Sequence, residues 1–235
     1  QPDTSQQRSN PGNSIHRDSM ESQDEPAQRF PERYLVLIEF AHQHLDFLMA
    51  ELESILQLNG IVLGGPECRL ERLLHQERFD ELIEEQAKTD GFQKMAKRPF
   101  ALLSFSLESK WTPSSGKIGK PTPKQSCIGE ILLDRCVLVR SVIELWGMAP
   151  TPSECASSVK DWISSTKVGR AIIDQQRHIS RSWKVTIHTL GSTFTRDEQA
   201  EMRDHFAFLD LQGQVKMKNP TDEYILIREV ELNYK

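Results

Sequence analysis

The stretch from Trp183 to Val230 constrains the fold most, because strands, a helix and turns can all be read from it. Its elements, in chain order, are predicted as a strand, a helix, a basic strand and a last strand at Trp183–Leu190, Thr195–Leu209, Val215–Lys218 and Glu223–Val230. Thr195 and Glu198 fit the reciprocal capping box, in which a hydroxyl and a carboxylate satisfy amides left free at a helix start. The helix is therefore expected to begin there.

Cations recur around these elements at strand edges and turns, where charged side chains reach solvent rather than the core. They are Arg177, Arg181, Lys184, Arg196, Lys216 and Lys218. Lys216 and Lys218 are alternate residues of one predicted strand and should therefore point to the same face. Such a surface suits a polyanion, although plain surface solubility explains any single cation about equally well.

The charge balance restricts where such a surface can lie. The chain of 235 residues carries 29 Lys and Arg against 34 Asp and Glu, which gives a formal net charge of -5. A protein that coats nucleic acid over its whole surface usually has a strongly positive balance. Any nucleic-acid site must therefore be local.

The cysteines favour an intracellular protein. Four are widely spaced, with no C-x-x-C pair and no Cys/His cluster at zinc-finger spacing: Cys68, Cys127, Cys136 and Cys155. We expect them to be reduced, mostly buried thiols in a cytoplasmic protein. No apolar run approaches the roughly 18 residues that a membrane span needs, so no membrane contact is expected. The chain begins with Gln, which leaves targeting untested.

The first half of the chain alternates strands and helices. Residues 1–31 are polar, and because they cannot bury enough surface to offset their ordering entropy we predict a disordered tail. The next elements are predicted as strand, helix, strand, helix and strand at Tyr34–Phe40, 45–56, Phe100–Leu107, Ser126–Arg140 and Ser141–Trp146. Gly60 is placed to end the first helix. This order opens a ferredoxin-like split βαβ sandwich.

Two insertions interrupt this order. The segment 66–98 is predicted to form one or two peripheral helices, because it carries an apolar stripe of Leu70, Leu73, Leu74, Leu82 and Ile83. The segment 108–125 collects Pro, Ser, Gly and Lys in the manner of a flexible loop. That loop is either solvated or a basic flap over nucleic acid, and it carries Trp111, the most plausible exposed aromatic residue.

A second domain is predicted to follow. Thr151 and Glu154 form another capping box, with a proline at the first helical position. We place the domain boundary near Ala149, which gives a first domain over 32–149 and a second over 150–235.

No catalytic constellation is evident from the sequence. His188 lies on a predicted strand without an identifiable nucleophile or partner acid and is interpreted as structural. Glu144 lies in an apolar strand and is expected to face solvent or to make a domain-interface pair. The tryptophans in apolar patterns are expected to pack in the core: Trp146, Trp162 and Trp183. We therefore predict no catalytic, cofactor-binding or metal-binding residue.

The order of short motifs along residues 34–230 resembles a known family. The motifs are Tyr34–Phe40 leading into Glu51-Leu-Glu-Ser54, Phe100–Ser104, Ile143-Glu-Leu-Trp-Gly147, Trp183–Thr189, Phe208-Leu209 and Gly213–Pro220. In this order they are similar to the N-terminal half of the catalytic subunit of eukaryotic tRNA guanine-10 N2-methyltransferases. The resemblance implies an α/β (α+β) chain in which a ferredoxin-like domain is followed by a tRNA-binding THUMP domain.

The same resemblance implies that the second domain grips tRNA by shape and phosphate contacts, with the six cations as RNA-binding candidates. The family's methyltransferase domain has a Gly-rich turn for S-adenosylmethionine and an acidic-Pro-Pro-aromatic motif for the target guanine. Gly64-Gly65 and Asn219-Pro220-Thr221 lack those patterns. We therefore expect the catalytic domain to be absent from this chain, which should be inactive alone.

Partners follow from the resemblance as well. S-adenosylmethionine and a zinc-binding activating subunit are implied for the missing domain, and tRNA for this chain. Two other functions stay open. One is a stand-alone THUMP adaptor that presents tRNA to a separate modifying enzyme, and the other is the N-terminal part of a tRNA thiolase.

Overall fold

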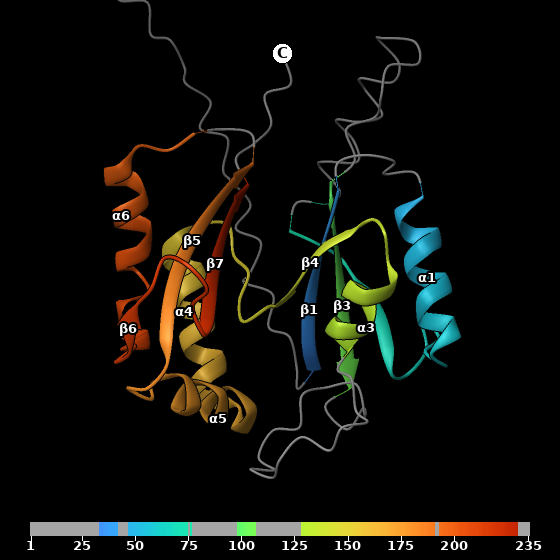
Figure 1. Ribbon diagram of the computed structural model, residues 1–235, viewed down its shortest axis with the longest axis horizontal. Helices are drawn as coiled ribbons and strands as arrows, with labels where there is room; N and C mark the ends of the chain where they lie inside the picture. The colour runs from blue at the N-terminus through green and yellow to red at the C-terminus, as the bar shows by residue number, and fades with distance from the viewer. Residues whose placement is uncertain are drawn as a thin grey trace, which may run out of the picture.

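The computed structural model describes residues 33–41, 47–74, 76, 98–106, 128–190 and 193–229. Within these ranges the strands form two sheets, and Figure 1 shows helices packed along each of them. We call β1 to β4 with their helices the first unit, and α4 to β7 the second unit. The expectations for the tail, for Leu82 and Ile83 and for the basic loop fall outside the described residues.

The first unit has the predicted ferredoxin-like fold. Its elements are β1 (Arg33–Phe40), α1 (Leu48–Leu58), β2 (Cys68–Glu71), β3 (Phe100–Ser106), α3 (Ile128–Arg135) and β4 (Val139–Glu144). The strands form one antiparallel sheet in the order β2-β3-β1-β4. A β-α-β-β-α-β chain in this strand order is the split βαβ arrangement.

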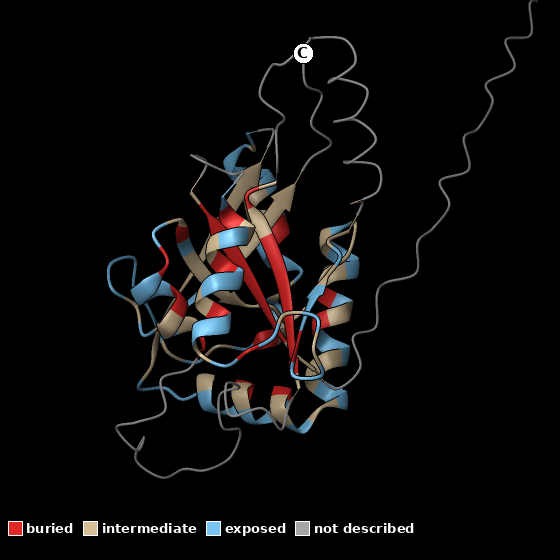
Figure 2. Ribbon diagram, turned by 90° about the vertical axis from the view of Figure 1, so that its right-hand side faces the viewer, coloured by how far each residue is buried: buried red, intermediate tan, exposed pale blue. Residues whose placement is uncertain are grey.

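Strand β1 runs through the middle of this sheet and is buried from Leu35 to Phe40. Successive side chains of a strand point to opposite faces. Val36, Ile38 and Phe40 therefore pack with α1 and α3, whereas Leu35 and Leu37 belong to a cluster on the other face. Each such burial stabilises the fold by about 1.5–3 kcal/mol. Figure 2 shows buried residues along these strands and on the helix sides turned toward them.

The prediction of helices over 66–98 is wrong for Cys68–Glu71, whereas Gln76 is helical. Cys68–Glu71 form β2, and Leu70, expected on a helix, pairs with Leu103 of β3. The leucine spacing is helical only locally. Pairing with β3 completes the edge of the sheet, and packing in the sheet overrides the local pattern.

A chain of polar contacts fixes β2 against β3. Ser104 of β3 is fully buried, accepts a hydrogen bond from Arg33 Nε at 2.9 Å and donates one to a carboxylate oxygen of Glu71. Because a buried hydroxyl without partners would be costly, these two bonds favour this register of the edge strand.

Helix α3 ends sooner than the helix predicted over Ser126–Arg140. The chain leaves the helix where the Glu51 carboxylate of α1 accepts hydrogen bonds from the amides of Val137 and Leu138, at 2.7 and 3.0 Å. Val139, expected on the helix, therefore begins β4.

The second unit is built on a parallel sheet. Its elements are α4 (Pro152–Ser165), α5 (Lys167–Gln176), β5 (Ser182–Leu190), α6 (Arg196–Asp204), the 3-10 helix η1 (Ala207–Leu209), β6 (Gln214–Val215) and β7 (Asp222–Glu229). The strand order is β6-β5-β7, and β5 pairs with β7 over its length. Helix α5 was not predicted, and the helix predicted to reach Leu209 gives way to η1 after Asp204.

Local capping places the helices of this unit as predicted. The Thr151 hydroxyl accepts from the Glu154 amide at 3.2 Å, and the Glu154 carboxylate accepts from the Thr151 amide at 3.1 Å. Thr195 and Glu198 make the same reciprocal pair at the start of α6. Both predicted capping boxes are therefore confirmed, and Thr166 caps α5 through a bond that was not predicted.

The core of the second unit is small. Its main cluster contains only three buried residues, Val159, Ile173 and Leu209, and no residue of β5 is buried. Trp146 packs on this cluster as predicted and stacks on the half-buried Trp162 with ring centroids 5.7 Å apart. The unit therefore depends more than the first on contacts at its margins.

The described cysteines are free thiols. Cys68 and Cys136 are buried and Cys155 is half-buried, while Cys127 lies outside the described residues. Burial raises the pKa of Cys68 to about 12, partly offset by the nearby Arg33 charge, and that of Cys136 to about 11. Thiols this weakly acidic are poor nucleophiles at neutral pH.

Candidate nucleic-acid interface

Two of the predicted site cations are engaged in ion pairs with β7. Arg181, just before β5, forms a bidentate pair with the Asp222 carboxylate, and this bond raises the pKa of the guanidinium. Lys184 on β5 lies 2.8 Å from a carboxylate oxygen of Glu223. Bonds from Lys184 and Thr186 lower the pKa of the Glu223 carboxyl. These two cations are therefore partly neutralised and hold β5 and β7 together.

Arg177 has a structural role. Its Nε donates to the Leu209 carbonyl at 2.8 Å, and its Nη2 donates to the Phe208 carbonyl at 3.1 Å. The guanidinium therefore satisfies backbone acceptors of η1, which would otherwise lack a partner at the end of that helix.

Lys216 and Lys218 are exposed but do not share a strand. Strand β6 ends at Val215, so the prediction of a strand reaching Lys218 is wrong. The Lys216 amide still donates to the Trp183 carbonyl at 3.0 Å, after which the chain turns through Asn219, whose φ of 47° is left-handed. Both lysines therefore project from a loop beside the start of β5, where no described carboxylate pairs with them.

Arg196 lies apart from the other cations. It is the first residue of α6, which follows the carboxyl end of β5, whereas the two exposed lysines lie beside its amino end. The structure therefore brings together Arg181, Lys184, Lys216 and Lys218 and leaves Arg196 at the other end of the strand.

Exposed apolar side chains accompany the lysine loop, and the sequence reasoning missed them. Val215 and Met217 are 55% and 71% exposed and alternate with the two lysines. Ile179, in the turn before β5, is 76% exposed. The alternating sequence Val-Lys-Met-Lys over 215–218 could have indicated these exposed apolar residues. Strand β6 ends at Val215, so neither the lysines nor the apolar residues that alternate with them are covered by a sheet. We call residues 215–218 the lysine-loop surface.

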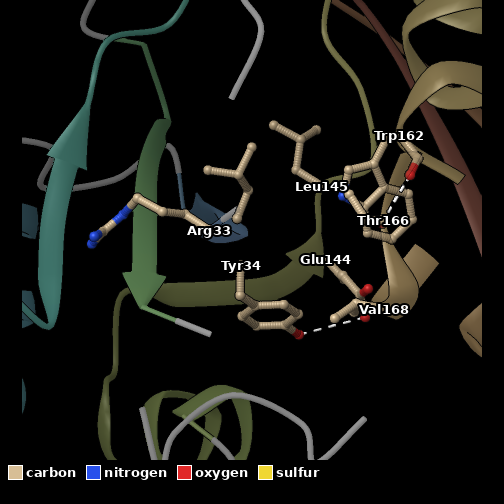
Figure 3. A pocket seen from close by; sticks show the side chains of 8 residues that line it. Arg33, Tyr34, Glu144, Leu145, Trp162, Thr166 and Val168 are labelled. Carbon is tan, nitrogen blue, oxygen red and sulfur yellow. Dashed lines mark hydrogen bonds between the residues drawn. The ribbon is translucent and has the colours of Figure 1, made fainter. Parts of the chain in front are cut away.

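A second set of polar residues lies where β4 meets α4. Glu144 accepts a hydrogen bond from Trp146 Nε1 at 3.1 Å and another from the Tyr34 hydroxyl at 3.5 Å. Figure 3 shows Tyr34 and Glu144 opposite Trp162 and Thr166. These residues line a cavity of about 20 Å³, which has room for about one water molecule.

Burial dominates the electrostatics of this junction. It raises the pKa of the Glu144 carboxyl, and the bonds from Trp146 and Tyr34 offset part of that effect. The cavity is too small for a substrate and contains no nucleophile. Glu144 therefore lies where the two units meet, but its described hydrogen bonds go to Trp146 and Tyr34 within the predicted first domain, so the expected pair between domains is not among them.

His188 sits on β5 near Glu223, whose carboxyl pKa it lowers slightly after the larger contributions of Lys184 and Thr186. An open hollow of about 230 Å³ lies between α4, α6 and β7 and is lined mainly by Phe194, Met202, His205 and Arg228. The Arg228 guanidinium donates to the Pro150 carbonyl at 2.6 Å, so it is already engaged. Neither place combines a nucleophile with a base.

Among the described residues, no group of three or more His, Cys, Asp or Glu could hold a metal ion. Likewise, none of the helices in the described ranges is long and apolar enough to cross a membrane.

Part of the chain matches a known protein family. The family described as Tmrp11 THUMP N-terminal domain matches residues 121–235. This match includes α3 and β4 of the first unit and all of the second unit, including every predicted RNA-binding residue.

Individual relatives extend the similarity toward the N-terminus. The chain is 27% identical over 201 residues to the tRNA (guanine(10)-N(2))-methyltransferase TRMT11 of Pongo abelii, covering 86% of this chain and 32% of the relative. The human protein of the same name is 26% identical over the same share of this chain. That of Gallus gallus is 22% identical over 198 residues. The chain thus spans about a third of the length of the curated relatives it matches.

These similarities agree with the two sheets. The ferredoxin-like topology of the first unit was expected from the resemblance, and the family match contains the second unit with its capped helices. The resemblance of this chain to the N-terminal region, ferredoxin-like plus THUMP, of the eukaryotic tRNA guanine-10 N2-methyltransferase catalytic subunit is confirmed.

Proposed function

We propose that this chain binds tRNA and positions it for methylation of guanine 10 by a separate catalytic domain. The observation that carries the proposal is the similarity of 86% of the chain to tRNA (guanine(10)-N(2))-methyltransferases, including a THUMP match over residues 121–235. The lysine-loop surface supports it, because it offers exposed cations within a protein whose net charge is -5.

The lysines of this surface are the primary phosphate contacts in this proposal. Lys216 and Lys218 are exposed, and no described acid neutralises them, whereas Arg181 and Lys184 are held by Asp222 and Glu223. Arg181 and Lys184 serve chiefly to fix the sheet beneath the loop. Arg177 holds η1, and Arg196 contacts RNA only if the ligand extends along β5.

The chemistry of methyl transfer is assigned to the separate domain. That domain would bind S-adenosylmethionine and the zinc-binding activating subunit. The residues described here supply orientation instead, which contributes to catalysis by holding the target in reach of the reacting groups.

A binding titration tests the proposal. Fluorescence anisotropy with labelled tRNA should give a dissociation constant that rises at least tenfold in the double variant Lys216→Glu, Lys218→Glu. Each lost phosphate contact should also reduce the salt slope by about 0.7–0.9. Far-ultraviolet circular dichroism checks that the variant is folded.

The matched control changes the net charge equally at another exposed place. Lys160 of α4 and Lys167 of α5 are both exposed, so Lys160→Glu, Lys167→Glu carries the same charge change. Equal losses in the two double variants would mean that net charge, not the lysine-loop surface, governs binding. No measurable tRNA binding by the unmodified chain would refute the proposed function.

A further inference from the structure

We propose that Arg98 and Glu229 form a clamp that sets the orientation of the second unit relative to the first. The pair joins the residue stretch that enters β3 to the last residue of β7, so it connects the two sheets. It deepens the proposed function and rests on it only where RNA affinity is concerned, since the orientation itself is a property of the free protein.

The geometry of the pair is bidentate. Arg98 Nε donates to Glu229 Oε1 at 2.8 Å, and Arg98 Nη2 lies 2.7 Å from Glu229 Oε2. A guanidinium and a carboxylate joined by two parallel bonds are constrained in direction as well as distance. The pair therefore fixes an angle between the two elements that carry it.

The cation of this pair is more buried than the cations of the ion pairs within the second unit. The Arg98 side chain is 8% exposed, whereas that of Lys184 in the Lys184–Glu223 pair is 20% exposed. Arg98 is also held from the first unit, because its Nη1 donates to the Leu74 carbonyl at 2.8 Å and to Gln76 Oε1 at 3.3 Å. The cation is thus a rigid part of the first unit, and Glu229 is the residue that reaches across.

Apolar contacts near the clamp also join β7 to the first sheet. Ile227, two residues before Glu229 and on the same face of β7, packs against the cluster of Leu35, Leu37 and Leu102 on the first sheet. The face of β7 with Ile227 and Glu229 therefore meets the first sheet, and the clamp lies at the end of that contact. Because β7 pairs with β5 over its length, a contact that fixes β7 also fixes the sheet of the second unit.

Orientation matters because a ligand that touches both units gains affinity only when both surfaces are correctly placed. A linked pair of surfaces acts at a high effective concentration if its geometry fits, and loses that gain if the geometry fluctuates. If tRNA also contacts the first unit, the clamp therefore places the lysine-loop surface for that shared ligand.

The test compares two glutamates of β7. Glu229→Gln removes the charge that reaches Arg98, whereas Glu223→Gln removes an ion pair formed within the second unit. Spin labels are introduced as unnatural amino acids at exposed Gln57 of α1 and Asp204 of α6, which avoids the native cysteines. Pulsed dipolar spectroscopy then measures the distance distribution between the units in the free protein.

We expect Glu229→Gln to broaden this distribution at least twofold and Glu223→Gln to leave it unchanged. Arg98→Lys keeps the charge but loses the bidentate geometry, so it should broaden the distribution to an intermediate extent. This milder variant keeps the test valid if Glu229→Gln does not fold. An unchanged distribution in folded Glu229→Gln or Arg98→Lys would overturn the clamp.

RNA affinity separates the clamp from the proposed function. If the unmodified chain binds tRNA, Glu229→Gln should weaken binding threefold or more, while Glu223→Gln should not. Equal affinities despite a broadened distribution would overturn the claim that the clamp positions the lysine-loop surface. Failure of the unmodified chain to bind would overturn the proposed function alone, because the distances decide the clamp without RNA.

Discussion

Among the described glycines, Gly213 is the one at which an added methyl group should lower the free energy of unfolding most. It precedes β6, and a Cβ placed there would penetrate the carbonyl oxygen of Arg181. Its own carbonyl accepts a hydrogen bond from Trp183 Nε1 at 2.8 Å. Because the obstacle is backbone rather than a flexible side chain, Gly213→Ala must push β6 away from β5.

The cost can be worked out from these contacts. Inserting an atom into a packed site costs about 1–3 kcal/mol, and losing the Trp183 bond adds about 1 kcal/mol. The second unit should therefore lose about 2–4 kcal/mol of unfolding free energy. At about 2–4 °C per kcal/mol, the melting temperature should fall by roughly 4–16 °C.

The assay is urea unfolding followed by tryptophan fluorescence, together with thermal unfolding followed by circular dichroism. Gln212→Ala is the control, because Gln212 is exposed in the same turn and bonds only to Asp210. A free energy of unfolding for Gly213→Ala within about 0.5 kcal/mol of the unmodified chain would refute the close-approach argument, since that is the usual range of surface substitutions. The same variant should weaken tRNA binding, because β6 carries the lysine loop.

Three further predictions concern a buried carboxyl and two helix caps. Burial raises the folded-state pKa of Glu144, so its ionised form costs stability above that pKa and the cost disappears as the pH falls. Glu144→Gln should therefore be as stable as or more stable than the unmodified chain at pH 8, with a smaller gain at pH 5 in urea titrations; a larger gain at pH 5 would contradict this sign. Thr195→Ala should cost about 0.5–2 kcal/mol by loss of the α6 cap, and Thr195→Ser should restore it. Hydrogen exchange should show the loss in α6 and not in α4. Thr151→Ala should cost a similar amount, with faster exchange in α4 instead.

Features set by neighbours in sequence were predictable. The capping boxes at Thr151 and Thr195 depend on residues three positions apart, and β1 is a short apolar run bounded by polar residues. Such local patterns can be recognised without knowledge of the rest of the fold. Both helix starts and the central strand therefore follow from the local sequence.

Features set by distant partners were not predictable. Strand β2 pairs with β3, and its Leu70 fits a helical stripe with the later leucines only when β3 is ignored. The end of α3 depends on Glu51, which lies on another helix. The local spacing of apolar residues gives no information about either contact.

The candidate site divides in the same way. Six cations could be named from composition, but Arg181 and Lys184 are neutralised by Asp222 and Glu223 from a strand about 40 residues later. Lys216 and Lys218 are exposed, as expected, but the strand predicted to carry them ends at Val215. The pair of Arg98 and Glu229 could not be predicted from the sequence, because Glu229 lies 131 residues later in the chain.

The central position of β1 has a consequence for how the chain folds. Val36 pairs with Glu144, more than 100 residues later, and also with Leu103. Closure of such remote pairs is slow, because loop entropy is lost before the contacts form. During synthesis β1 must stay without its β4 neighbour until Glu144 has emerged from the ribosome. Strand β1 precedes both of its partners in the chain and thus becomes the middle of a sheet that closes last along the β4 edge.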